Sequence, residues 1–500
     1  MNALIALPLI LPLLTAALCA LARHNDRAQY LLSLISSILQ TVVALWLVLY
    51  VADHGMQATH AGGWQAPYGI VLVADLLGAI MVLLTGLIGL ATVVYSHISL
   101  PDADRSPAFH PLVHFLLLGV SGAFLTGDLF NLYVCFEVML LASFALLALE
   151  GRAEQTEGTV KYVVLNLLSS AIFLSALGLL YAEAGTVNMA HVAAIAREAA
   201  ALDQDLGALQ LAGLLFVVAF SVKAGLFPVF FWLPASYHTP SVPVSALFAG
   251  LLTKVGVYAL IRLYTLIMPD RVLGHEFLLW LGVATMITGV LGAASQMGIR
   301  RILSFHIISQ IGYMIVGVGL GTPLGLAACI FYLYHNTIAK SNLFLVGGVA
   351  ADCTGSEDLR RSGGMWLAWP VLGLVFLVPA LALAGIPPLS GFVAKLGVVW
   401  ACVLEERWWV VAAALFTGAF TLFSMFKIWF EVFWKDHPGG EVDVENKRDW
   451  RRLAPMVVLA LITIALGLGA GPFFTLCQQA ATELSDPSLY IDCVLPEGAP

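Results

Sequence analysis

The chain has 500 residues, of which 60% are hydrophobic and only 11% are charged. A soluble globular domain carries about 25% charged residues, so this composition excludes a soluble enzyme and indicates an integral membrane protein with no nucleic-acid partner. The formal net charge of −8 is less informative than the positions of Lys and Arg, because these residues set the orientation of membrane helices.

Apolar runs long enough to cross a bilayer as helices, about 20 residues each, recur along the whole chain. Fourteen are predicted, with approximate limits 2–22, 28–52, 70–95, 110–126, 129–149, 160–183, 208–234, 242–267, 276–295, 302–320, 324–348, 366–400, 409–434 and 453–477. The first run lacks a preceding basic segment, so it is predicted to be a membrane helix rather than a cleaved signal peptide. The predicted fold class is therefore an all-α membrane protein of about fourteen transmembrane helices, with the short tail after the last helix outside the membrane.

Basic residues concentrate in alternate loops. One set of loops (23–27, 96–109, 150–161, 296–301, 349–365 and 435–452) holds fourteen Lys and Arg residues, including Arg105 and Lys447. The other set holds three, Arg197, Arg271 and Arg407. Because basic loops stay in the cytoplasm, the sequence predicts a multi-pass protein of the bacterial cell membrane with both termini on the outer face.

Two of the runs are longer than one span requires and contain internal proline. These are the seventh run (208–234, predicted helix 7), with Pro228, and the twelfth run (366–400, predicted helix 12), with Pro387 and Pro388. They are five helices apart, which suggests a repeat of five helices. A repeat with an odd number of helices must be inverted in the membrane. In folds built from inverted repeats, paired broken helices mark the transport site. The predicted units are N-terminal helices 1–3 (1–109), a first repeat of helices 4–8 (110–267), a second repeat of helices 9–13 (268–434), and a final segment (435–500) with a cytoplasmic loop, helix 14 and an external tail.

Six of the 23 basic residues fall inside predicted spans: Lys223, Lys254, Arg262, Lys340, Lys395 and Lys427. Arg262 and Lys427 lie near helix ends, so their side chains are predicted to snorkel to the membrane surface. Each of the other four would cost about 2.5–3.5 kcal/mol at a lipid-facing helix centre. These four lysines are therefore predicted to face the protein interior and water.

Glu137, in the fifth run, is the predicted partner of Lys223. The two would form either a fixed ion pair that holds helices together or a switchable pair that changes the lysine's affinity for a proton. With Lys254, His335, Lys340 and Lys395 they form an ordered series of titratable groups, which predicts a proton relay, although His335 alone is equally consistent with an ordinary core histidine. His306 and Ser309 would extend the series.

Other side chains give weaker signals. Asp75 and Asp128 lie near helix ends and are either helix caps or part of a cation path; capping is favoured for Asp128. The seven cysteines contain no C-x-x-C pair, which argues against a metal site or a disulfide framework. No phosphate-binding or dinucleotide-binding motif occurs, so no cofactor is predicted, and no residue pattern indicates where sodium would bind.

Five stretches together resemble a known family. They are "FEVMLLASFALL" around Glu137, "FSVKAGLFPVFFWLP" around Lys223, "LLTKVGVYALIRLY" around Lys254, "HNTIAKSNLFLVGG" and "AGIPPLSGFVAKLG". In order and spacing they are similar to the proton-conducting antiporter family, which includes the antiporter-like subunits of respiratory complex I and the large subunits of Mrp-type multisubunit Na⁺/H⁺ antiporters. The resemblance extends over nearly the whole chain and implies the fold and the transport function of that family.

Within the family, the chain resembles the Mrp D-type subunit. Ala235 and Tyr237 stand where the complex I pattern has Asp and His, Lys395 matches the D-type pattern, and no lateral helix or further domain follows helix 14. The resemblance implies a complex with a large A subunit, a C subunit and small membrane subunits, which exchanges cytoplasmic Na⁺ for external H⁺. It also implies that Glu137 and Lys223 form a gating pair and that Lys395 ends the second half-channel. The alternatives are a proton-pumping membrane subunit of a complex I-type NADH:quinone oxidoreductase, and a non-transporting scaffold.

Overall fold

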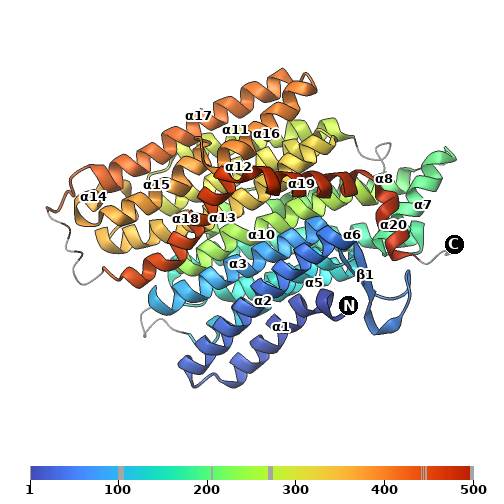
Figure 1. Ribbon diagram of the computed structural model, residues 1–500, viewed down its shortest axis with the longest axis horizontal. Coiled ribbons are helices and arrows are strands. Elements are labelled where there is room, and N and C mark those ends of the chain that lie inside the picture. The colour runs from blue at the N-terminus through green and yellow to red at the C-terminus, as the bar shows by residue number, and fades with distance from the viewer. Residues whose placement is uncertain are drawn as a thin grey trace.

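A computed structural model describes residues 2–99, 106–203, 206–268, 274–440, 442, 444 and 448–495. Long helices, most of them lying side by side, make up almost all of this structure (Figure 1). The helices of the N-terminal half are α1 Asn2–Leu21, α2 Asp26–His54, α3 Leu76–Ser99, α4 Phe109–Leu125, α5 Leu129–Leu147, α6 Ala153–Ala184, α7 Met189–Ala201, α8 Gly207–Ala224, α9 Trp232–Ser236 and α10 Val242–Arg262. Those of the C-terminal half are α11 His275–Ser295, α12 Ile299–Gly319, α13 Pro323–Thr354, α14 Met365–Ala368, α15 Pro370–Ala384, α16 Ser390–Leu404, α17 Trp408–Ile428, α18 Leu453–Leu468, α19 Ala470–Ser485 and α20 Pro487–Val494.

Each of the fourteen predicted apolar runs contains helix. Among the described residues, eleven helices are long and apolar enough to cross a membrane, and α4, α15 and α16 are shorter apolar helices. The protein is therefore an all-α membrane protein in its main architecture. The run predicted at 453–477 is divided at Gly469 into α18 and α19.

Three small elements were not predicted. Strands β1 Gln57–His60 and β2 Val71–Ala74 form an antiparallel hairpin, so the run predicted to begin at residue 70 starts as a strand. The amphipathic helix α7 and the short helix α20 lie near the hairpin at one end of the molecule (Figure 1), and α20 contacts both α7 and β1. Their apolar faces are too short to produce a membrane-span signal, which is why hydropathy did not reveal them.

The two termini of the described chain lie at the same end of the bundle, near α20 and β1 (Figure 1). This agrees with an even number of crossings. Arg105, Arg271 and Lys447, which contributed to the predicted orientation, lie outside the described residues. The face of the membrane on which the termini lie stays a prediction.

The core of the protein is formed by α10, α12 and α13, which are almost completely enclosed by other helices. Helix α13 packs against α3, α10, α12, α15, α16, α18 and α19. A helix with protein on every side has no lipid-facing surface, so a polar side chain on it can be solvated by other polar groups. These three helices carry Lys254, His306, His335 and Lys340.

Both predicted helix breaks occur, and they have the same local structure. Helix α8 ends at Gly225 and helix α15 at Gly385, and both glycines have positive φ values, +75° and +91°, that favour glycine. In each case the glycine and the next residue donate their N–H groups to one carbonyl, that of Ser221 in α8 and that of Leu381 in α15. Pro228, Pro387 and Pro388 lie in the turns that follow.

A second feature also recurs in the two halves. The chain before α5 pairs with the chain before α7 through an isolated bridge between Asp128 and Asn188. The chain before α12 pairs in the same way with the chain after α13, between Gly298 and Asp358. The partners are 60 residues apart in both halves, so residue 128 corresponds to 298 and residue 188 to 358.

Candidate functional site

Lys223 lies in the last turn of α8, immediately before the break, and is buried. Its Nζ donates to Ser170 Oγ at 3.0 Å and to the carbonyl of Asn166 at 3.3 Å, both on α6. It also lies 5.8 Å from the centre of the Phe136 ring on α5. The ammonium group is therefore held by polar atoms of one neighbouring helix and by the face of an aromatic ring from another.

The predicted contact between Glu137 and Lys223 is not made in this conformation. No ion pair joins them among the described residues, and Glu137 Oε1 is buried without a hydrogen-bond partner there. Their charges still interact through the intervening space. In this conformation Ser170 and Asn166, which the sequence did not single out, bind the lysine, and the pairing of Glu137 with Lys223 stays a prediction.

Lys254 on α10 and Lys340 on α13 are fully buried in the enclosed core. Lys254 Nζ donates to the carbonyl of Ala249 at 2.5 Å, and Lys340 Nζ donates to the carbonyl of Leu303 on α12 at 3.3 Å. Neither lysine has a carboxylate partner among the described residues, and the two charges repel each other. These two ammonium groups thus lack the counter-charge that a buried ion pair would supply.

His335 and Lys395 line the region next to the second break. His335 Nδ1 lies 2.8 Å from Ser390 Oγ at the start of α16, and Lys395 Nζ donates to the carbonyl of Ala384 at the end of α15. Lys395 also lies 5.3 Å from the centre of the Tyr313 ring. The second half therefore places its lysine after the break, whereas the first half places Lys223 before it.

A chain of hydrogen bonds on α12 and α13 leads toward His335. His306 Nδ1 lies 3.5 Å from Ser309 Oγ, which accepts from Gln310 Nε2 at 3.0 Å. Tyr332 donates to Gln310 Oε1 at 2.5 Å, and its ring contacts His335 edge-on. The structure thus places His306 beside the predicted series, and it adds Gln310 and Tyr332, which sequence analysis missed because neutral side chains give no charge signal.

Several fully buried polar atoms along these helices have no hydrogen-bond partner among the described residues. They are Thr253 Oγ1, both amide atoms of Asn336, and the Nε2 atoms of His306 and His335. Buried polar groups are otherwise satisfied by protein or by ordered water, and water fits where a site is polar. The atoms mark positions where a water chain would complete the hydrogen bonding between the lysines and histidines.

Arg262 and Asp75 form a buried ion pair, with 2.6 Å between Arg262 Nη2 and Asp75 Oδ1. The arginine side chain also contacts the rings of Tyr258 and Tyr490. The prediction that Arg262 snorkels was therefore wrong: the arginine is enclosed because α20 brings Tyr490 over it. Asp75 additionally accepts from the N–H of Gly78, so it caps α3.

Lys427, like Lys395, is only partly buried. Its Nζ donates to the carbonyls of Ala294 and Gln296 at the end of α11, at 2.9 and 2.6 Å. A lysine at this position binds carbonyl groups that the helix itself leaves unpaired. These two bonds tie α17 to the end of α11.

Asp128 caps α5, as sequence analysis favoured. Its side chain accepts from the N–H of Asn131 at 2.8 Å. Burial raises the pKa of the Asp128 carboxyl, and the N–H groups of Asn131 and Phe130 lower it.

The replacement Asp128→Ala is expected to destabilise the protein by about 1 kcal/mol through loss of this cap. Asp128→Asn, which keeps an acceptor oxygen, is expected to cost less than half as much. Thermal unfolding of the purified variants measures the difference. An equal cost for alanine and asparagine would contradict a capping role.

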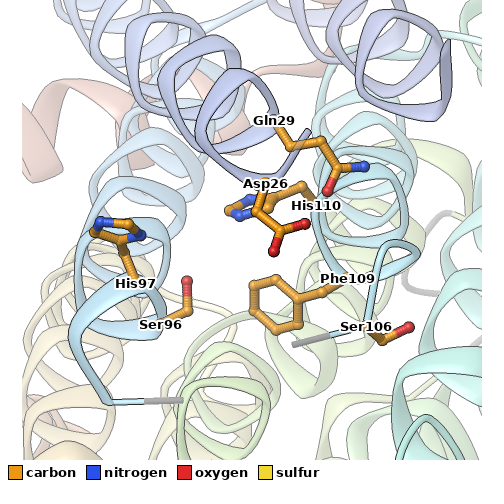
Figure 2. A pocket seen from close by; sticks show the side chains of 7 residues that line it. All are labelled: Asp26, Gln29, Ser96, His97, Ser106, Phe109 and His110. Atoms are coloured by element: carbon orange, nitrogen blue, oxygen red, sulfur yellow. The ribbon is translucent and has the colours of Figure 1, made fainter. Parts of the chain in front are cut away.

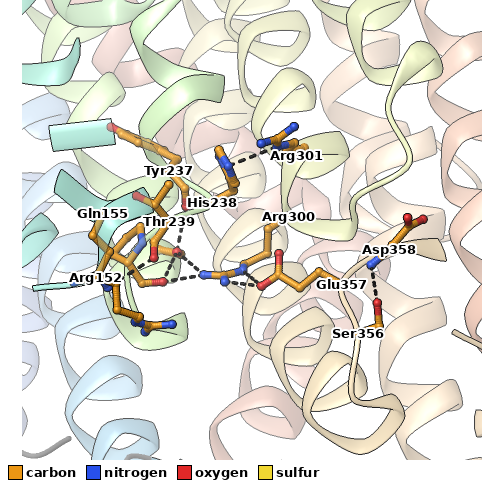
Figure 3. Close-up of polar contacts among 12 residues, drawn as sticks. Arg152, Gln155, Tyr237, His238, Thr239, Arg300, Arg301, Ser356, Glu357 and Asp358 are labelled. Atoms are coloured by element: carbon orange, nitrogen blue, oxygen red, sulfur yellow. Dashed lines mark hydrogen bonds and ion pairs between the residues drawn. The ribbon is translucent and has the colours of Figure 1, made fainter. Parts of the chain in front are cut away.

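Polar contacts join the two halves near the start of α10 and α12 (Figure 3). Arg300 forms an ion pair with Glu357 and donates to the carbonyl of Pro240 and to Ser245 Oγ. Arg301 donates to His238 Nε2 at 3.1 Å. Burial and the charges of Arg301 and Arg300 lower the pKa of His238 to about 4, so this histidine is neutral near pH 7 and can accept that bond.

A polar cavity of about 570 Å³ lies beside these contacts. Its charged lining residues are Glu150, Arg152, Arg300, Asp352, Glu357 and Arg452. It adjoins Ser241 and Pro243 at the start of α10, the helix that carries Lys254. The cavity thus lies at the start of α10, among residues of the basic loops.

Comparison with known proteins gives one consistent result. The family described as NADH:quinone oxidoreductase/Mrp antiporter, TM, matches residues 126–421. The chain is 42% identical to the D-type subunit of the Na(+)/H(+) antiporter of Alkalihalophilus pseudofirmus over 99% of this chain and 100% of that protein, and 38% identical to that of Bacillus subtilis with the same coverage. It is similar to a chain in the structure of the Mrp complex from Dietzia sp. DQ12-45-1b, with a TM-score of 0.91, 32% identity, and coverage of 99% of this chain and 100% of that one.

Proposed function

Because the chain belongs to the NADH:quinone oxidoreductase/Mrp antiporter family, as a D-type subunit of the Mrp Na⁺/H⁺ antiporter, we propose that it conducts protons through a buried relay coupled to Na⁺ efflux. The chain is a transporter subunit rather than an enzyme, and it is a multi-pass membrane protein within a multisubunit complex. Its proposed partners are a large A subunit, a C subunit and small membrane subunits, with H⁺ moving inward as Na⁺ moves outward.

The relay is supported above all by one observation. Lys254 and Lys340 are fully buried on helices enclosed by protein, bind only carbonyl oxygens, and have no carboxylate partner among the described residues. An ion pair whose only role is structural would include the opposite charge. Ammonium groups without a counter-charge, next to unpartnered polar atoms, are suited to releasing and accepting protons through water.

The proposed order runs from Lys223 through Lys254 and Lys340 to His335 and Lys395. Glu137 acts on the first lysine: when its carboxylate approaches, the charged form is stabilised, and when Ser170 and Asn166 hold the lysine alone, the proton is released more readily. The conformation described here has Lys223 on Ser170, which corresponds to the open form of the pair. His306, Gln310 and Tyr332 form a side branch that hydrogen-bonds toward His335.

We further propose two inverted repeats, α4 to α10 and α11 to α17, within fourteen membrane crossings. Two observations support this assignment. The hydrogen bonds at Gly225 match those at Gly385, and in each half an isolated bridge joins residues 60 positions apart. The first bridge is offset from the second by 298 − 128 = 170 residues, and the same offset aligns Asn166 with Asn336 and Ser170 with Lys340. The position that binds the relay lysine in the first repeat would then hold a lysine of its own in the second.

The orientation follows from the loops that carry most of the basic residues, which we assign to the cytoplasm. The cavity lined by Glu150, Arg300 and Glu357 then opens to the cytoplasm, and both termini lie outside. The cavity is the proposed cytoplasmic mouth of the central relay. The acidic and basic side chains that line it can accept protons from the cytoplasm and release them.

The decisive experiment compares everted membrane vesicles that contain the complete complex with vesicles from cells lacking only this chain. Addition of Na⁺ is expected to dissipate a preformed proton gradient in the first and not in the second, with the other subunits present in equal amounts. Exchange that persists without the chain would contradict the proposal. Co-purification of flavin and iron–sulfur subunits, with acidification driven by NADH, would instead support a complex I-type proton pump.

A further inference from the structure

A second buried polar region lies between α2 and α4, apart from the central relay. Helix α2 is mostly apolar, but Gln29, Ser33, Ser36, Ser37 and Gln40 are all buried polar residues three or four positions apart. This spacing gathers them along one side of the helix. We refer to these residues, together with His114 and Ser121 of α4, as the α2–α4 polar file.

Two hydrogen bonds connect the two helices along the file. Ser33 Oγ lies 2.7 Å from His114 Nε2, and Gln40 Nε2 donates to Ser121 Oγ at 3.2 Å. The partners in both bonds are 81 residues apart. From the first bond to the second, both helices therefore advance in the same direction by about two turns, so α2 and α4 run parallel. The polar side chains therefore converge on one interface and are not scattered around the helices.

Four atoms of the file have no hydrogen-bond partner among the described residues. They are the Oγ atoms of Ser36 and Ser37, Oε1 of Gln40, and Nδ1 of His114. All four side chains are more than nine-tenths buried. Three of the four atoms are neutral oxygens, the type of ligand that a hard cation such as Na⁺ accepts in place of its hydration water.

One end of the file opens at a small cavity of about 30 Å³, the space of roughly one water molecule. Its lining residues, shown in Figure 2, are Asp26, Gln29, Ser96, His97, Ser106, Phe109 and His110. The Asp26 carboxylate lies among these side chains, where it would attract a cation (Figure 2). The mouth is therefore narrow, polar and marked by a negative charge.

The other end of the file closes within the membrane. Beyond Gln40 the buried residues of α2 are apolar: Ala44, Leu47, Val48 and Val51. At 1.5 Å per residue, the distance from Gln29 to Gln40 is about 16 Å, roughly half of the 30 Å hydrocarbon core. The unpartnered oxygens of Ser36, Ser37 and Gln40 thus lie near the middle of the membrane, and the cavity itself reaches the file only at Gln29.

We propose that the α2–α4 polar file is a binding site for a monovalent cation, Na⁺ in this transporter, with Ser36, Ser37 and Gln40 as its ligands. The identity of the cation rests on the proposed function. The central relay carries lysines, which repel Na⁺, whereas α4 and the part of α2 between Gln29 and Gln40 contain no lysine or arginine. The cavity at the Gln29 end of the file lies on the side assigned to the cytoplasm, from which Na⁺ is expelled.

The first test measures Na⁺/H⁺ exchange by the complete complex in everted vesicles. The double replacement Ser36→Ala with Ser37→Ala, and separately Gln40→Leu, are each expected to raise the Na⁺ concentration for half-maximal exchange at least about 10-fold. The matched control is Ser424→Ala, because that buried serine bonds only within its own helix, to the carbonyl of Phe420. An unchanged half-maximal concentration, or a rate lowered equally at every Na⁺ concentration, would overturn the site.

The second test does not depend on exchange, so it separates a failed cation site from a failed proposed function. In a complex whose D-type chain lacks its native cysteines, Ser37→Cys is exposed from the cytoplasmic side, in a nitrate medium, to Ag⁺, a thiol-reactive monovalent cation small enough for this mouth. Labelling is expected, and Na⁺ is expected to slow it at least about 3-fold relative to equal choline. Ala44→Cys, beyond the end of the file, is expected to stay unlabelled. Absent labelling of Ser37→Cys, or labelling that Na⁺ leaves unchanged, would refute the site.

Discussion

Replacement of Lys223 by methionine is expected to lower Na⁺/H⁺ exchange by at least about 100-fold, the usual scale for loss of a group that transfers protons. Lys223→Arg is expected to be almost as inactive. Arginine keeps the positive charge but does not release its proton in the physiological range. The two variants together therefore distinguish a lysine that carries protons from a lysine that only supplies a fixed charge.

The measurement is the rate of gradient dissipation by the complete complex in everted vesicles, normalised to the amount of assembled complex. Lys427→Met and Lys427→Arg are the matched controls, because Lys427 is a helical lysine that only binds carbonyls at the end of α11. Both are expected to keep most of the wild-type rate. Full activity of Lys223→Arg would show that the charge at this position is structural.

The membrane architecture was predictable because burial in lipid imposes a simple rule on the sequence. Every helix that faces lipid needs a long apolar run, and such runs rarely occur for another reason. Each of the fourteen runs accordingly contains helix in the structure. The breaks were equally visible, since Pro228 and Pro388 follow glycines that end helices. The lysines stood out for the same reason: a charge in an apolar run must have a protein or water environment.

The partners of those lysines were not predictable from the same signals. Ser170, Asn166 and Gln310 are neutral, and a neutral polar residue in a membrane helix is too common to indicate which charge it binds. Contacts between elements distant in sequence also escaped notice, as with Tyr490 of α20, which covers Arg262. The polar spacing in α2 was present in the sequence, but it became informative only once α4 was seen to place His114 and Ser121 opposite it.

The buried pair of Arg262 and Asp75 leads to the second large expected effect. Arg262→Met leaves Asp75 enclosed without its counter-charge, next to Glu483, whose carboxylate accepts from the N–H of Leu76. Removal of one partner of a buried pair costs about 3–5 kcal/mol. We expect Arg262→Met to lower the stability of the purified chain by this amount, measured as thermal or denaturant-induced unfolding in detergent.

The double variant Arg262→Met with Asp75→Asn is expected to recover most of the loss, because replacing both members of a buried pair is often close to neutral. With Asp75→Asn alone as the fourth protein, the comparison forms a double-mutant cycle that isolates the interaction between the two side chains. The exposed pair of Arg407 and Glu276, with side chains 41% and 50% exposed, is the control, and Arg407→Met is expected to cost less than about 1 kcal/mol. If Arg262→Met costs no more than Arg407→Met, the arginine is solvated at the membrane surface, and the enclosure of this end of the bundle by α19 and α20 does not hold in the membrane.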